Sequence, residues 1–291
     1  EARLWLGMCE AKLGRADAAL ATLARAAAAL AATGAAADKR ALAAFEAGNA
    51  AFALSRHAEA EARYTEALSI SPDYPEAHAN AGVVAFVVGG RYREAVLRFE
   101  GALRVAPAFA DAWQHLGAAH KALGAPDAAH DAYARAASLA ATNPEPLRGV
   151  ALVARERNRQ PEALHALRRA LTLAPRYAQL YIDLGISHDY REEREAAMAA
   201  YRSASAIAPA AVPQAPYLEF RAAKSVALWA GWDGHVRRIA TELRADGGAA
   251  RLQVDPVASL HFPFRAAELL AVVQTATRTK LASGDRPPPA A

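Results

Sequence analysis

A pattern of small residues returns about every 34 residues along much of this 291-residue chain, and it constrains the fold more than any other feature. Five small first positions are 34, 35, 34 and 34 residues apart, and each is followed by an alanine, a large side chain and a second alanine. Small residues let two antiparallel helices approach closely, while the large side chain fills the gap beside them. The pattern therefore predicts a series of stacked helical hairpins. Its members are Gly48, Gly82, Gly117, Ala151 and Gly185; Ala60, Ala95, Ala129, Ala163 and Ala197; Tyr64, Phe99, Tyr133, Leu167 and Tyr201; and Ala67, Ala102, Ala136, Ala170 and Ala204.

Prolines mark the ends of the hairpins. Because proline cannot continue a helix, it is expected shortly after the second helix of each unit. One unit has Ala141 at this place, and there Asn143-Pro144 provides the break. The other four closing prolines are Pro72, Pro107, Pro175 and Pro209.

The pattern extends once more toward the N-terminus through Gly7, Ala19, Leu23 and Ala26, which predicts a sixth repeat. Seven residues, 34–40, are inserted before the next repeat and are expected to form a longer loop or additional helical turns. The pair Gly89-Gly90 is expected to lengthen one turn between helices.

This period and pattern resemble those of tetratricopeptide (TPR) repeats. The resemblance implies an all-α fold, a right-handed TPR superhelix (α-solenoid) of about six repeats over residues 1–211. The composition agrees, because the chain is 54% hydrophobic with only 7% aromatic residues and is rich in alanine, the best helix former. A solenoid needs a line of small helix contacts instead of one large core.

Charge and cysteine content narrow the function classes. The formal charge of +4 is spread over interleaved acids and bases without a basic block, so we expect no nucleic-acid partner. No apolar run approaches the ~20 residues of a membrane span, so we expect no membrane partner. The single cysteine, Cys9, is expected to be a small buried residue in a reducing, intracellular compartment, cytoplasmic or nuclear. Because the chain starts inside an expected helix at Glu1, we expect a fragment of a longer protein.

The sequence contains no motif that carries catalysis. Glycine-rich phosphate loops, a nucleophile elbow, H-E-x-x-H and C-x-x-C are all missing, so we expect no catalytic residue, no metal site and no cofactor. His115 and His120 lie five residues apart, about 140° around a helix, and so do not share a face.

The first helices of TPR units line the concave face of a solenoid, and this face predicts a peptide-binding groove. Amide and basic side chains would bond a peptide backbone while apolar side chains form pockets for alternate residues. The apolar candidates are Phe45, Phe52, Val83 and Val87. The polar candidates are Asn49, Asn80, Gln114, His115, Lys121, Arg148, Arg155 and Asp183.

Residues 212–280 leave the repeat pattern and are expected to contain a capping helix, 217–228, with its polar residues outward, and then a junction. The junction motifs are Trp229-x-x-Trp232-Asp233, Pro256 in a V-x-P segment, and Phe262-Pro263. Repeats followed by these motifs resemble the start of the catalytic region in protein O-GlcNAc transferases and SPINDLY-like relatives. The tail, 281–291, is expected to be disordered.

The resemblance implies the substrate-recruiting arm of an enzyme that transfers GlcNAc from UDP-GlcNAc to serine or threonine of proteins. The sugar nucleotide would bind to a domain beyond residue 291, so the chain alone would be inactive. On this reading Trp229, Trp232, Phe262 and Phe264 would form an exposed apolar patch, whereas in a self-contained adaptor they would fold back onto the array.

The alternative is a TPR adaptor or scaffold that binds peptide segments of partner proteins without catalysis. One type clamps a C-terminal carboxylate between asparagines and basic residues. Asn49 and Asn80 stand at the asparagine positions, but Phe45, Asp111 and His115 occupy the basic ones. Asp111 would repel a carboxylate, which argues against this clamp.

Overall fold

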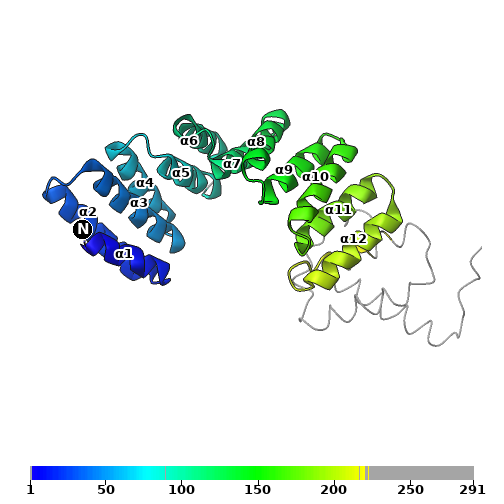
Figure 1. The fold of residues 1–291 in the computed structure, drawn as a ribbon, viewed down its shortest axis with the longest axis horizontal. Coiled ribbons are helices and arrows are strands. Elements are labelled where there is room, and N and C mark those ends of the chain that lie inside the picture. The colour runs from blue at the N-terminus through cyan, green and yellow to red at the C-terminus, as the bar shows by residue number, and fades with distance from the viewer. Residues whose placement is uncertain (1, 89, 216, 220–221, 223–291) are drawn as a thin grey trace, which may run out of the picture. The chain divides into compact units, whose positions relative to one another are not determined.

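The computed structural model describes residues 2–88, 90–215, 217–219 and 222, and all regular structure within them is α-helical (Figure 1). The all-α prediction is therefore confirmed for this part of the chain. The chain divides into two compact units, Glu1–Arg157 and Asn158–Ala291.

The first unit contains nine helices among its described residues, and each packs against the next. Odd-numbered helices are the first helices of hairpins and even-numbered helices are the second. The helices are α1 (Ala2–Lys12), α2 (Ala16–Ala32), α3 (Ala37–Ala53), α4 (His57–Ile70), α5 (Pro75–Val87), α6 (Tyr92–Val105), α7 (Ala110–Ala122), α8 (Pro126–Leu139) and α9 (Glu145–Glu156).

The second unit contains α10 (Gln160–Leu173), α11 (Ala178–Tyr190) and α12 (Arg194–Ile207), again with consecutive helices in contact. After α12, the residues Val212, Ala215 and Leu218 pack with Met198 and Tyr201 of α12 in one apolar cluster. This segment closes the outer side of the last hairpin.

In the hairpins, glycines of the small-residue pattern lie against the large side chains of the second helix, as predicted. A Cβ atom on Gly48 would lie 2.6 Å from Tyr64 Cε1, and one on Gly82 would lie 2.7 Å from Phe99 Cε1. Both aromatic side chains are almost fully buried. In each pair the aromatic ring therefore lies directly against the backbone of the first helix, where only glycine leaves room.

The closing prolines are also in phase with the helices. Helices α4, α6, α10 and α12 each end two residues before a proline, namely Pro72, Pro107, Pro175 and Pro209. Three of these prolines have a further role that the sequence analysis missed, because their carbonyl oxygens bond a side chain six residues later. The bonds are Trp113 Nε1 to Pro107 at 2.8 Å, His78 Nε2 to Pro72 at 2.9 Å and the Tyr181 hydroxyl to Pro175 at 3.1 Å.

The inserted residues before the second repeat lengthen helices instead of a loop. Helices α2 and α3 have 17 residues each, whereas α4 has 14 and α5 has 13. The insertion is thus taken up as almost one further turn on each of two paired helices. Three of the seven inserted residues are alanine, which favours helix formation.

Each turn inside a hairpin contains one residue with a positive φ angle. Gly14, Gly90 and Gly124 provide it at no steric cost, with φ of 73°, 63° and 70°. The same conformation is taken by Ser55, Asn158 and Glu192 in other hairpins. The turn between α5 and α6 has four residues where the others have three, as expected from the additional glycine; Gly89 itself lies outside the described residues.

Two sequence predictions about burial are wrong. Cys9 is exposed, because it lies on the side of α1 away from α2. In the segment after α12, Glu219 does not point outward: it is fully buried and accepts a hydrogen bond from Arg202 Nε at 2.6 Å. The guanidinium of Arg202 compensates the buried carboxylate, which explains how an acidic residue can face the last hairpin.

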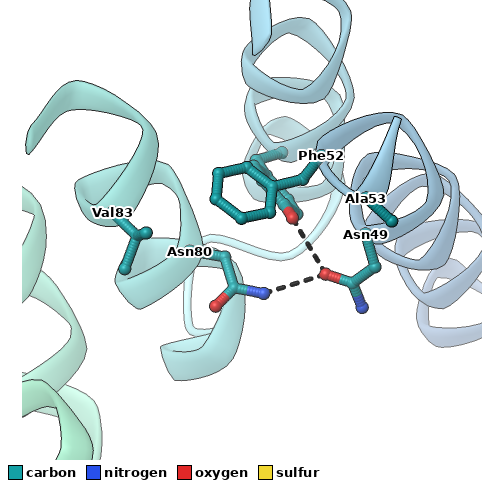
Figure 2. A pocket seen from close by; sticks show the side chains of 6 residues that line it. Asn49, Phe52, Ala53, Asn80 and Val83 are labelled. Carbon is teal, nitrogen blue, oxygen red and sulfur yellow. Dashed lines mark hydrogen bonds between the residues drawn. The ribbon is translucent and has the colours of Figure 1, made fainter. Parts of the chain in front are cut away.

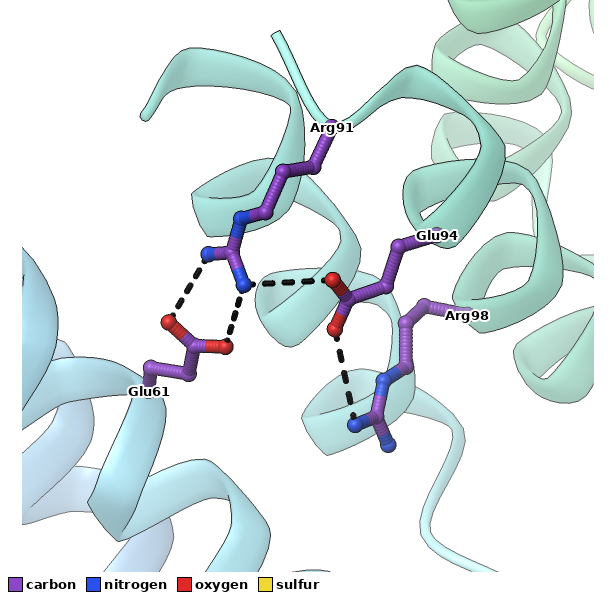
Figure 3. Close-up of polar contacts among 4 residues, drawn as sticks. All are labelled: Glu61, Arg91, Glu94 and Arg98. Atoms are coloured by element: carbon purple, nitrogen blue, oxygen red, sulfur yellow. Dashed lines mark hydrogen bonds and ion pairs between the residues drawn. The ribbon is translucent and has the colours of Figure 1, made fainter. Parts of the chain in front are cut away.

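Arginine side chains connect successive repeats of the first unit. Arg91 donates two hydrogen bonds of 2.8 Å to Glu61 of the preceding repeat and one of 3.1 Å to Glu94 (Figure 3). The Arg91 hydrogen bonds hold the pKa of Glu61 below its ordinary value. Arg56 likewise forms an ion pair with Asp17 of the preceding repeat, and Arg157 forms one with Asp127.

Candidate functional site

Two asparagines from consecutive first helices meet in the first unit. Asn49 lies on α3 and Asn80 on α5, and Asn80 Nδ2 donates to Asn49 Oδ1 at 2.8 Å (Figure 2). The same oxygen accepts a hydrogen bond of 2.9 Å from the Tyr64 hydroxyl of α4. Burial raises the pKa of Tyr64 well above its usual range, so its hydroxyl stays neutral and remains a donor. Asn49 is thereby held in one orientation.

These asparagines line a pocket of about 180 Å³ whose other walls are Phe52, Ala53, Tyr64 and Val83 (Figure 2). Small-molecule sites have volumes of about 300 Å³ and more, so this pocket suits a single side chain better than a cofactor. Val87, one helical turn beyond Val83, is 56% exposed and extends the apolar surface along α5.

The amides keep hydrogen-bonding capacity for a ligand. An asparagine side chain offers two N–H donors and a carbonyl acceptor. The Asn80 oxygen has no hydrogen-bond partner among the described residues. Asn49 Nδ2 makes one bond, 3.3 Å long, to Glu46. An incoming peptide group could therefore bond Asn80 without breaking the contact between the two amides.

Phe45 does not line this pocket, and its assignment as a groove residue is corrected. It is 9% exposed and its ring lies 5.0 Å from that of Tyr74 and 5.9 Å from that of Tyr64, measured between centroids. Burial raises the pKa of Tyr74 to about 12. Phe45 thus belongs to an aromatic core cluster, which also leaves no cation at this place to clamp a carboxylate.

Gln114 and His115 of α7 are both half-buried, and each has its own neighbour. Gln114 Oε1 accepts a hydrogen bond of 3.2 Å from Asn143. The His115 imidazole stacks on Phe99 with ring centroids 5.6 Å apart. Burial lowers the pKa of His115, although the Asp111 carboxylate opposes the shift. His115 is therefore a neutral, flat polar surface and not a cation.

The basic candidates are only partly available for a ligand. Lys121 Nζ lies 3.3 Å from Glu156, and Arg148 Nη1 lies 3.4 Å from Glu145. Arg155 is half-buried on α9. Each of the two ion pairs offsets a positive charge, so this surface is of mixed polarity and not strongly basic.

Asp183 lies in the second unit and is 3% exposed. Its assignment to the groove surface is corrected, because a buried carboxylate within α11 is not accessible to a peptide. The structure thus brings together Asn49 and Asn80, places Gln114 beside Asn143, and buries Phe45 and Asp183.

The junction candidates Trp229, Trp232, Asp233, Pro256, Phe262 and Pro263 lie outside the described residues, as does Phe264. Within the described part, no helix is long and apolar enough to cross a membrane, and no group of three or more metal-binding side chains comes together.

Comparison with known proteins supports the repeat architecture. The family model described as "TPR repeat" matches residues 48–89, which begin at Gly48 and include Asn49 and Asn80. The fold is a TPR solenoid. No curated protein matches the sequence.

Several solved TPR structures are similar to the chain. A tetratricopeptide repeat protein from Parabacteroides merdae has 16% identity and a TM-score of 0.65, with 94% of this chain and 98% of that chain covered. PilF of Pseudomonas aeruginosa has 15% identity and a TM-score of 0.62, with 82% and 99% covered. YrrB, described as "a TPR protein with an unusual peptide-binding site", has 26% identity and a TM-score of 0.53, with 63% and 92% covered. The comparisons provide no support for the resemblance to O-GlcNAc transferases.

Proposed function

We propose that this chain is a protein-binding adaptor or scaffold that holds an extended peptide segment on the first helices of its first unit. The observation that carries the proposal is the pocket at the paired amides of Asn49 and Asn80, with the apolar side chains of Phe52 and Val83 beside them. The peptide-binding site named for YrrB supports the same class of ligand.

The chemistry of the pocket suits a peptide in extended conformation. Such a segment alternates its side chains, so one apolar side chain can enter the pocket while the adjacent backbone bonds the Asn80 amide. The hydrogen bonds from Asn80 and Tyr64 hold Asn49 in place before binding, which reduces the entropy lost on association. We expect the bound side chain to be aliphatic or aromatic, because the walls are mainly carbon.

Selection of a displayed peptide library on the purified chain tests the proposal. We expect selected peptides to share an apolar anchor, and Asn80→Ala to weaken the best peptide about 10-fold or more, since a buried peptide group would lose its partner. Val83→Glu should abolish binding. Leu97→Glu is the matched control, because Leu97 is 67% exposed on the second helix α6 and should bind normally.

Equal weakening by Val83→Glu and Leu97→Glu, or full binding by Asn80→Ala, would place the peptide elsewhere. Circular dichroism of each variant separates loss of binding from loss of folding.

A finer proposal is that the same surface recruits substrates for a protein O-GlcNAc transferase. It rests on the junction sequence in residues 222–275 alone. Reading the parent gene past residue 291 tests it: a UDP-sugar-binding domain supports the transferase and a stop codon supports the adaptor. The chain itself should transfer no sugar from UDP-GlcNAc to an acceptor protein, and transfer above a no-protein control would contradict this expectation.

A further inference from the structure

Two carboxylates lie beside the paired amides of the pocket and are here called the acidic pair: Glu46 of α3 and Glu76 of α5. Glu46 Oε2 accepts the hydrogen bond of 3.3 Å from Asn49 Nδ2, so this carboxylate borders the pocket directly. Glu76 precedes Asn80 by four residues, which places it one helical turn away on the same side of α5. The two helices that provide the paired amides therefore also provide the acidic pair.

The charges of the acidic pair act on the same group. Burial is the main cause of the raised pKa of Tyr74, and the carboxylates of Glu76 and Glu46 both raise it further. Burial is also the main cause of the raised pKa of Tyr64, to which the charge of Glu46 adds. Negative potential is therefore concentrated at this end of the pocket.

Neither carboxylate of the acidic pair forms an ion pair with a described residue. Residues 41–90 contain two arginines, Arg56 and Arg63, and no lysine. Arg56 pairs with Asp17 at 2.8 Å, and Arg63 pairs with Glu66 at 3.0 Å. The arginines of this segment are thus engaged with other carboxylates.

The helix dipole explains only one member of the acidic pair. Glu76 lies in the first turn of α5, where the N-terminus of a helix favours a negative charge. Glu46 lies in the middle of α3 and is half-buried, while the two cations of that helix, Lys39 and Arg40, lie in its first turn. Partial burial of a charge without an opposite charge beside it costs free energy. A cation supplied by a ligand would stabilise Glu46.

We propose that the acidic pair selects the peptide bound at this site. The ligand is an extended segment with an apolar anchor in the pocket and a lysine or arginine two positions away, whose cation lies between Glu46 and Glu76. This inference rests on the peptide-binding function proposed above and adds the charge of the ligand. Complementary charges act mainly on specificity and on the rate of association, so the acidic pair would reject acidic segments with the same anchor.

The spacing of two positions follows from a peptide that runs along α3 and α5. Glu46 and Phe52 are six residues apart, and Glu76 and Val83 are seven apart, which gives about 9–10.5 Å along the helix axes at about 1.5 Å per residue. Side chains two positions apart in an extended peptide share a face and are about 6.6 Å apart. The long stem of lysine or arginine spans the remaining distance of about 3–4 Å. The backbone between them would then pass the Asn80 amide.

Selection of displayed random heptapeptides on the purified 291-residue chain tests the charge of the ligand. We expect selected peptides to carry lysine or arginine two positions from the apolar anchor. Selection on Glu76→Lys should lose this enrichment, because the new cation repels the basic residue. Glu100→Lys is the matched control, since Glu100 is exposed on the second helix α6, and it should select the same peptides as the unaltered chain.

Affinities of the best selected peptide measure each carboxylate. Glu46→Gln removes the charge but keeps an oxygen that can accept the hydrogen bond from Asn49. We expect Glu46→Gln to weaken binding about 10-fold and Glu76→Gln about 3-fold, because an exposed ion pair contributes less than a half-buried one. Replacing the basic residue of the peptide by glutamine should weaken binding to the unaltered chain and have little further effect on the double variant.

The results distinguish this inference from the proposed peptide site. Selected peptides that require Val83 but carry no basic residue overturn the role of the acidic pair and leave the peptide site standing. Full affinity of Glu46→Gln/Glu76→Gln, or basic peptides still enriched on Glu76→Lys, has the same meaning. Peptides that bind equally well to Val83→Glu, or the absence of any selected peptide, overturn both. Because Glu76 is exposed, Glu76→Lys should fold whatever the effect of Glu46→Gln, and circular dichroism verifies this.

Discussion

Replacing Gly117 by leucine tests whether the repeated small residues are a packing requirement. A Cβ atom at Gly117 would lie 2.8 Å from Cγ and Cδ1 of Tyr133, closer than real contacts allow. The ring cannot easily retreat, because a Cβ on Gly149 of α9 would lie only 2.5 Å from Tyr133 Cδ1, so a second backbone confines it. Overpacking at such a site costs up to about 3 kcal/mol. Removing glycine from a helix interior returns about 0.8 kcal/mol, which leaves a net destabilisation of about 2 kcal/mol.

Urea unfolding followed by circular dichroism measures this cost, with the slope of the transition compared among variants. Ala122→Leu is the control, since it adds leucine to an exposed site on the same helix and should change stability by about 0.5 kcal/mol or less. In a Tyr133→Ala background, Gly117→Leu should become nearly neutral because the leucine enters the vacated space. Equal effects of Gly117→Leu and Ala122→Leu, or additivity with Tyr133→Ala, would refute the packing argument.

Three further perturbations follow from the backbone and the charges. Glu192 has φ of 61°, so Glu192→Gly should stabilise the chain by about 0.5–1 kcal/mol in urea unfolding, whereas Gly124→Ala, at φ of 70°, should destabilise it by a similar amount. The lowered pKa of Glu61 stabilises the fold above pH 4.5, and this contribution is lost as the pH falls through the lowered pKa. Arg91→Gln should therefore reduce the loss of unfolding free energy over this acidic range. An unchanged pH dependence would contradict the pairing of Glu61 with Arg91. Because the pKa of His115 is lower in the folded chain, the unfolded chain binds more protons as the pH falls below 6.5, and the folded state should lose stability there. His115→Gln should therefore reduce the decline in melting temperature between pH 7 and pH 5.

Much of the fold could be predicted because its decisive contacts are local. Gly48 meets Tyr64 and Gly82 meets Phe99 across a single turn, so one hairpin contains both partners. The ends of the hairpins could be predicted from Pro72 and its equivalents, because a proline breaks the helix directly before it. The inserted residues left two solutions open, a loop or longer helices, and only the pairing of α2 with α3 selected the second.

The candidate site was predicted less completely. Asn49 and Asn80 were identified from their places on first helices, but their bond joins residues 31 positions apart, and periodicity contains no information on side-chain orientation. Phe45 and Asp183 also lie on first helices, but both are buried. The packing of neighbouring helices decides which positions on a first helix water can reach.

The sequence by itself determined the repeat length, the hairpins and the residues that let paired helices approach, since these depend on neighbours within about one repeat. Only the tertiary structure decided that Tyr64 orients the asparagine pair, that Glu219 is buried against Arg202, and that Asp183 is buried. Asn80 and Asp183 occupy equivalent positions, two residues before the first glycine of their repeats, yet Asn80 is partly exposed and Asp183 is buried. The physical reason is that burial depends on which surface packs against a helix, and that surface belongs to a different segment of the chain.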